Sequence, residues 1–304
     1  SFDIVDLLSL TAGGGPGDLV RVYRKISDCY RKKGLLREAM SFLDSAATHC
    51  EEEDTIGRGA IACRRGIILY EKGDIKRGIR EACSAYRILR TSDEHREVAH
   101  TQLLIANCYA SPACSDEPRD YPLDALFSYR RIGDTVGESY VLNNLGLFHK
   151  NACRWGRAIQ FLGRALEICD EIGLTQHRVR VTLNMGIVHL KMRDFAGAES
   201  AFVAARDMAR RIGDDLKYTK ATLMLGVKET KSGNLLSAEK HLLEARVTAE
   251  RRNYQREIAL ADEFIGDLMF ERGDLEDALE NYAISMKAAT RINPKGDIVA
   301  EVQR

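Results

Sequence analysis

A repeat of 40 residues runs through almost the whole of this 304-residue sequence. A small residue marks each copy, and consecutive marks are 40 residues apart except for a first step of 39. These anchor positions are Ser27, Gly66, Ala106, Gly146, Gly186, Gly226 and Gly266. A regular period of this length indicates a chain that stacks copies of one small structural unit, each of which buries its apolar face against its neighbours.

Each copy has three further columns that are typical of two packed helices. A small residue stands 12 positions after most anchors, a bulky residue 16 positions after, and a second small residue 19 positions after. In the fifth copy these are Ala198, Phe202 and Ala205. Helices approach closely only where the side chains at their crossing are small, so the anchor and the first alanine are expected to let the two helices meet. Glycines such as Gly173 and Gly213 fall between copies, where they suit the left-handed residue that ends a helix.

Three prolines, Pro112, Pro118 and Pro122, interrupt the third copy. Proline inside a helix removes a hydrogen bond and clashes with the preceding turn. We therefore expect a loop over residues 111–121, followed by a short helix over about 122–132. This loop is either a tolerated irregularity or a hinge or binding loop that divides the array into two blocks.

Composition excludes several classes of protein. Lys plus Arg and Asp plus Glu both number 45, so the formal net charge is zero and binding of nucleic acid through bulk positive charge is excluded. No apolar run approaches the roughly 20 residues that cross a bilayer. The eight cysteines have no CxxC spacing and no zinc-like cluster with histidine, so we expect reduced thiols, a cytoplasmic location, no metal and no cofactor.

No catalytic motif occurs in its required context, so an enzyme is not expected. His149 and His189 share one column of the repeat, three positions after the anchor. They are expected to make half-buried helix contacts rather than a metal site or an acid–base pair, since equivalent atoms of adjacent repeats are about 10 Å apart.

The succession of small anchor, alanine, bulky residue and alanine resembles the tetratricopeptide repeat family. The period of 40 residues, against about 34 in the usual repeat, is similar to the long-repeat branch found in bacterial regulators and sensors and in kinesin light chains. The resemblance implies an all-α fold, a right-handed α-solenoid of about seven helix-turn-helix repeats. The expected repeats are residues 18–53, 54–93, 94–133, 134–173, 174–213, 214–253 and 254–293.

Two further segments flank the expected solenoid of residues 18–293. Residues 1–17 contain an apolar-acidic segment and a glycine-rich linker, and residues 294–304 begin an eighth repeat or a capping helix. We expect the chain to be a piece of a longer protein. Residues 2–10 either cover a solenoid end or fill a groove, in the same chain or in a neighbouring one, or they are a flexible tail. The apolar ends of the solenoid offer a second route to self-association.

The resemblance also implies a binding site on the concave surface, which the first helix of each pair lines. The candidate residues lie at or beside the positions that line this surface in the family. They are Tyr140, Asn143, Asn144, Leu147, Lys150, Arg180, Asn184, Ile187, Lys191, Lys220 and Val227. In long-repeat relatives an asparagine at the place of Asn144 and Asn184 commonly grips an extended peptide, and an amide can both donate and accept hydrogen bonds.

The sequence therefore predicts a groove for an acidic-apolar peptide, clamped by asparagine and anchored by arginine or lysine. The alternative is that the asparagines bond neighbouring helices and the lysines are only solvated. At the level of function we expect a non-catalytic scaffold that binds a protein or peptide, with neither nucleic acid nor a membrane as partner. The alternative is a ligand-sensing regulatory module of a larger bacterial signalling or transcription-regulating protein.

Overall fold

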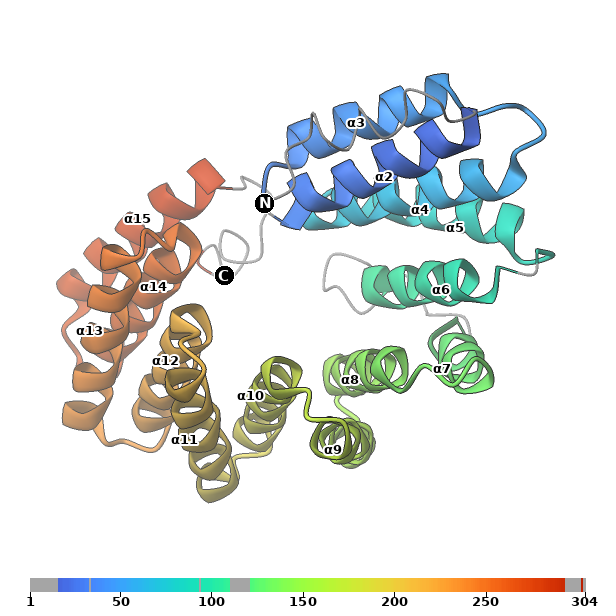
Figure 1. Ribbon diagram of the computed structural model, residues 1–304. Helices are drawn as coiled ribbons and strands as arrows, with labels where there is room; N and C mark the ends of the chain where they lie inside the picture. The colour runs from blue at the N-terminus through green and yellow to red at the C-terminus, as the bar shows by residue number, and fades with distance from the viewer. Residues whose placement is uncertain (1–15, 33, 93, 110–120, 293–301, 303–304) are drawn as a thin grey trace. The chain divides into compact units, whose positions relative to one another are not determined.

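The computed structural model describes residues 16–32, 34–92, 94–109, 121–292 and 302, and all regular structure in these ranges is helical (Figure 1). The chain divides into two compact units, with the boundary between Asn144 and Leu145. The helices of the first unit are α2 (Pro16–Lys32), α3 (Leu36–Thr48), α4 (Thr55–Glu71), α5 (Ile75–Leu89), α6 (His95–Tyr109) and α7 (Tyr121–Arg131). Helix α8 (Thr135–Asn151) contains the boundary. The second unit continues with α9 (Trp155–Glu171), α10 (Thr175–Lys191), α11 (Phe195–Arg211), α12 (Asp215–Lys231), α13 (Leu235–Arg251), α14 (Gln255–Arg272) and α15 (Leu275–Ile292).

Within each unit the helices pack as a succession of hairpins. In the first unit α2 packs on α3, α4 on α5 and α6 on α7, and in the second α10 packs on α11, α12 on α13 and α14 on α15. The first helices of successive pairs also contact one another, as α10 does α12 and α12 does α14. This arrangement confirms the predicted fold class, an α-solenoid of helix-turn-helix repeats. No helix in the described part of the chain is both long enough and apolar enough to span a bilayer.

The anchor glycines lie under the bulky residue of the second helix. A methyl group added to Gly186 would lie 2.5 Å from Phe202 Cε1, and one added to Gly226 would lie 2.5 Å from Leu242 Cδ2. Gly266 is covered in the same way by Tyr282, at 2.6 Å. The sequence predicted a close approach between the anchor and the first alanine. The structure adds that the bulky side chain 16 residues later fills the space that a side chain at the anchor would need.

The turns confirm the expected left-handed glycines and add three residues that the sequence did not indicate. Glycines with positive φ angles between 67° and 90° close seven turns: Gly34, Gly73, Gly133, Gly173, Gly213, Gly233 and Gly273. At Cys153, Arg193 and Asn253 a residue with a side chain adopts the same conformation, with φ angles of 55°, 60° and 57°. This conformation costs a non-glycine residue about 1–2 kcal/mol, so these three turns are strained relative to the others.

The proline-rich part of the chain fits the expected break only in part. The short helix predicted over 122–132 is α7, Tyr121–Arg131. Of the loop predicted over 111–121, residues 111–120 lie outside the described residues, and Tyr121 is the first residue of α7. Residues 1–15 and 294–301 lie outside the described residues as well. Helix α7 packs on α6, which precedes the prolines, and the boundary between the two units falls later, inside α8. The prolines therefore do not mark the division between the two units.

Candidate functional site

The exposed sides of α10, α12 and α14 form one continuous surface of the second unit, because these helices contact each other in sequence. Four columns of the repeat point to this surface, at six and two residues before the anchor and one and five after it. We call it the first-helix face. It consists of Arg180, Asn184, Ile187, Lys191, Lys220, Met224, Val227, Lys231, Leu260, Phe264, Asp267 and Glu271, all of which are exposed or half-buried. Six of the eleven predicted site residues are among them.

The remaining predicted residues lie on α8. Leu147 and Lys150 belong to the second unit, whereas Tyr140, Asn143 and Asn144 belong to the first. Leu147, Lys150, Tyr140 and Asn144 are half-buried.

Asn143 is only 3% exposed and does not lie on an open surface in this structure. Its equivalents three residues before the later anchors are buried too: Leu183 at 7%, Leu223 at 1% and Glu263 at 6%. For Leu183 and Leu223 the reason is that the side chain faces the next pair of helices. Leu183 belongs to the core that joins α10 and α11 to α12, and Leu223 to the core that joins α12 and α13 to α14. Leu183 and Leu223 therefore belong to the core beneath the first-helix face.

The two asparagines of the predicted clamp have different surroundings. The Asn144 amide donates a hydrogen bond to Asn107 Oδ1 and accepts one from Asn143 Nδ2, at 3.2 Å. Asn144 therefore links α6 to α8 within the first unit, as the structural alternative described. Asn184 is half-buried on the first-helix face, one turn from Arg180 and one turn from Ile187.

Positive charge gathers where α8 and α10 end. Burial, and then the neighbouring charge of Lys191, lower the pKa of Lys150. In the described ranges neither ammonium group has a carboxylate within ion-pair distance. Arg180 is exposed about three turns before Lys191 on α10. Two like charges without a counter-charge favour binding of an anionic group at this place.

Lys220 differs from this lysine pair. Its Nζ lies 3.4 Å from Glu257 Oε1, and the Glu257 side chain is only 7% exposed. The ion pair joins α12 to α14 and neutralises a nearly buried carboxylate. Removal of Lys220 would leave this carboxylate buried and unpaired, which is strongly destabilising. Lys220 therefore contributes to packing in addition to its place on the surface.

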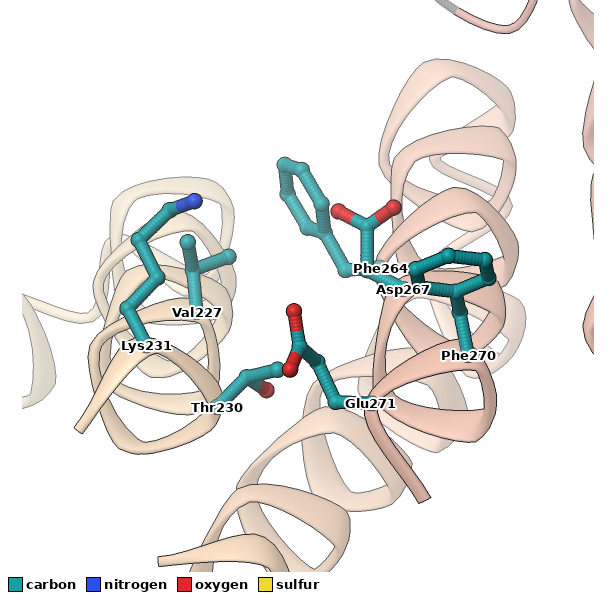
Figure 2. A pocket seen from close by; sticks show the side chains of 7 residues that line it. All are labelled: Val227, Thr230, Lys231, Phe264, Asp267, Phe270 and Glu271. Carbon is teal, nitrogen blue, oxygen red and sulfur yellow. The ribbon is translucent and has the colours of Figure 1, made fainter. Parts of the chain in front are cut away.

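A hollow of about 180 Å³ lies between α12 and α14. Its walls are Val227, Thr230 and Lys231 from α12, and Phe264, Asp267, Phe270 and Glu271 from α14. Figure 2 shows the two phenylalanine rings on either side of the Asp267 carboxylate, with the Glu271 carboxylate directed into the space between the helices. Of the eleven predicted site residues, Val227 is the one that lines this hollow.

Six of the seven lining residues are absent from the predicted set, and two of them, Lys231 and Glu271, belong to a column that the set already sampled at Lys191. Both stand five residues after their anchors, at the same offset as Lys191. Extending this column from α10 to the next two first helices would have found them. Phe270 lies one position earlier, and 58% of its surface is exposed. A phenylalanine so exposed leaves apolar surface in water that a ligand could cover.

The two histidines of the shared column are structural. His149 is 7% exposed and stacks on Phe161 of α9, with ring centroids 5.2 Å apart and planes at 4°. His189 Nδ1 lies 2.8 Å from Asp194 Oδ2, and Asp194 caps α11 by accepting a hydrogen bond from the Gly197 amide at 3.0 Å. Each histidine thus joins a first helix to the following second helix. The predicted packing role is confirmed, and the described residues contain no group of three side chains able to hold a metal ion.

Comparison with known proteins agrees with a fold of stacked helical hairpins. Residues 137–211 match the family model described as tetratricopeptide repeat. No curated protein matches the sequence. Residues 137–211 are therefore similar to tetratricopeptide repeats, and the helical hairpin unit continues on both sides of the matched residues.

Several solved structures share the fold at low sequence identity. The apo form of RapI is 18% identical with a TM-score of 0.73, and the match covers 91% of this chain and 99% of that one. A Rap protein complexed with Competence and Sporulation Factor is 15% identical with a TM-score of 0.74, covering 96% and 81%. The signal transduction ATPase PH0952 from Pyrococcus horikoshii, which has a tetratricopeptide repeat sensor, is 18% identical with a TM-score of 0.65, covering 92% and 44%.

Proposed function

We propose that the chain is a non-catalytic scaffold that binds an extended peptide, free or as a segment of a partner protein, on the first-helix face of the second unit. The observation that carries this proposal is the pairing of Lys150 and Lys191, two neighbouring ammonium groups without a carboxylate in ion-pair distance among the described residues. On α10 the apolar side chain of Ile187 lies one turn before Lys191, and Asn184, which can bond a peptide backbone, lies two turns before it. These groups suit an acidic residue or a terminal carboxylate next to an apolar side chain.

The structures of similar fold also support the proposal of a peptide ligand. One of the similar structures is a Rap protein in complex with Competence and Sporulation Factor. The balanced net charge argues against nucleic acid as the main partner. No two cysteines have CxxC spacing, and this favours reduced thiols and a cytoplasmic compartment.

The proposal is tested by binding of the full chain to an array of peptides of about nine residues, which span roughly 30 Å when extended. The affinities of the bound sequences are then measured by fluorescence anisotropy. Replacement of Lys150 and Lys191 by alanine should weaken binding of acidic peptides at least tenfold and flatten its dependence on salt. Lys240 and Lys287, exposed on second helices, provide a matched control pair that should leave binding unchanged. Equal affinity in both double variants, or no binding to any peptide, would refute the proposal.

A second candidate function is a sensor module within a longer regulatory protein. It is favoured by the match to PH0952, in which the similar region makes up 44% of the chain and the protein is described as having a tetratricopeptide repeat sensor. The two functions use the same surface. They differ in whether ligand binding changes the activity of another domain, which measurements on a longer form of the protein would reveal.

A further inference from the structure

The hollow between α12 and α14 differs in chemistry from the lysine pair near α10. Its apolar surface comes from Val227, Phe264 and Phe270. Its charged groups are two carboxylates, on Asp267 and Glu271, and one ammonium group, on Lys231. The hollow is therefore aromatic and carries a net negative charge.

The carboxylates converge on one place in the fold. Tyr282 of α15 donates a hydrogen bond of 2.8 Å to Asp267 Oδ1. Burial, then this hydrogen bond, and then the charges of Glu263 and Glu271 raise the pKa of Tyr282. Three carboxylates one turn apart on α14 thus act on a single neighbouring group, and an acidic cluster of this kind attracts a cation.

We propose that this hollow binds a cationic side chain, arginine or lysine, of the peptide held by the first-helix face. A guanidinium or ammonium group over a phenylalanine face is attracted by the ring, and its aliphatic stem covers apolar surface. The Asp267 and Glu271 carboxylates supply the counter-charge, and arginine can bond a carboxylate through two N–H groups at once. The inference rests on the proposed peptide-binding function and adds the charge pattern of the ligand.

The helix positions set the spacing of that pattern. The lysine pair stands four and five residues after the anchors, and the hollow extends from two residues before its anchors to five after them, so both include the last turn of their first helices. Packed helices are about 8–10 Å apart, so the distance from α10 to the space between α12 and α14 is roughly 15 Å. An extended chain covers this distance in about four or five residues. The ligand is therefore bipolar, with an anionic group and a basic residue about four positions apart.

The test uses the peptides of the array that bind the full chain. Each basic residue is replaced in turn, arginine by citrulline, which keeps the shape and loses the charge, and lysine by norleucine. One replacement, about four positions from an acidic residue or carboxylate, should weaken binding roughly tenfold. The variant Glu271→Gln should bind the original peptide roughly tenfold more weakly and bind the neutral peptide with unchanged affinity. Glu280→Gln, an exposed carboxylate on α15, is the matched control and should change neither.

The outcomes separate this inference from the proposed function. If bound peptides depend on Lys150 and Lys191 but are indifferent to loss of their basic residues and to Glu271→Gln, the inference is wrong and the peptide groove stands. If acidic residues are preferred at the position of the hollow, Lys231 dominates it and the inference is again wrong. If no peptide binds, both proposals fall together.

Discussion

Replacement of Gly186 by alanine tests the packing rule on which the solenoid depends. The added methyl group would lie 2.5 Å from Phe202 Cε1 and 2.7 Å from Cδ1. Phe202 is fully buried in a core with Ala198, Ala205 and Leu225, so its ring could move only by displacing packed neighbours. Overpacking of this kind costs about 1–3 kcal/mol, whereas alanine in place of glycine inside a helix stabilises by about 0.5–1 kcal/mol. We expect a net loss of about 1–2 kcal/mol.

Gly163 on α9 provides the matched control. It also lies inside a helix, but no atom of a neighbouring element is within 4 Å of a methyl group placed there. Gly163→Ala should therefore stabilise by about 0.5–1 kcal/mol through helix propensity alone. The measurement is the urea midpoint of the helical circular dichroism signal for each variant against the unchanged chain, since a stacked repeat protein need not unfold in one step.

A double variant isolates the contact itself. Phe202→Ala alone removes a large buried side chain and should cost about 3–5 kcal/mol. In that background the methyl group of Gly186→Ala enters empty space, so the second change should be neutral or stabilising. If Gly186→Ala and Gly163→Ala shift the urea midpoint in the same direction, or if the effect of Gly186→Ala is unchanged by loss of Phe202, the packing rule is refuted.

Three further predictions follow from single contacts. Arg193→Gly should raise stability by about 0.5–1 kcal/mol in the same urea assay, because glycine relieves the left-handed strain of this turn; a decrease would contradict the strain argument. Asn184→Ala should weaken peptide binding about tenfold with little loss of stability, whereas Asn144→Ala and Asn107→Ala should destabilise the first unit and show strong coupling in a double-mutant cycle. Burial, then the charges of neighbouring arginines, lower the pKa of His149 from its usual value of 6.5, so its contribution to stability is lost as the pH falls below that value. His149→Phe should therefore make the urea midpoint less sensitive to acid between neutral pH and about pH 5, and an unchanged slope would exclude this histidine as the cause.

The sequence predicted the helix pairs well because each pair is defined by local spacing. The anchor, the first alanine and the bulky residue lie within one pair, so their columns repeat wherever two helices must cross closely. The burial of Asn143 was not predicted, because in this column burial comes from outside the hairpin: its equivalents Leu183 and Leu223 pack against the first helix of the next pair, about 40 residues further along the chain. The left-handed conformation of Cys153 and Arg193 was not predictable either. Glycine is the residue that indicates such a conformation, and these two turns adopt it without a glycine.

Comparison of equivalent positions in the repeats separates residues that helix packing requires from residues that it does not. Where packing decides, they agree: the second small column is alanine in six of seven copies. The first-helix face does not follow this rule. Five residues after the anchor the chain has Lys191, Lys231 and then Glu271, and one residue after it Ile187, Val227 and then Asp267. Asp267 accepts a hydrogen bond from Tyr282, which stands where the two preceding repeats have Phe202 and Leu242, so packing within the hairpin accounts for that change. Among the described residues no such contact accounts for the change from Lys191 and Lys231 to Glu271 at equivalent exposed positions. The variation is therefore best explained by a ligand whose chemistry changes along its length.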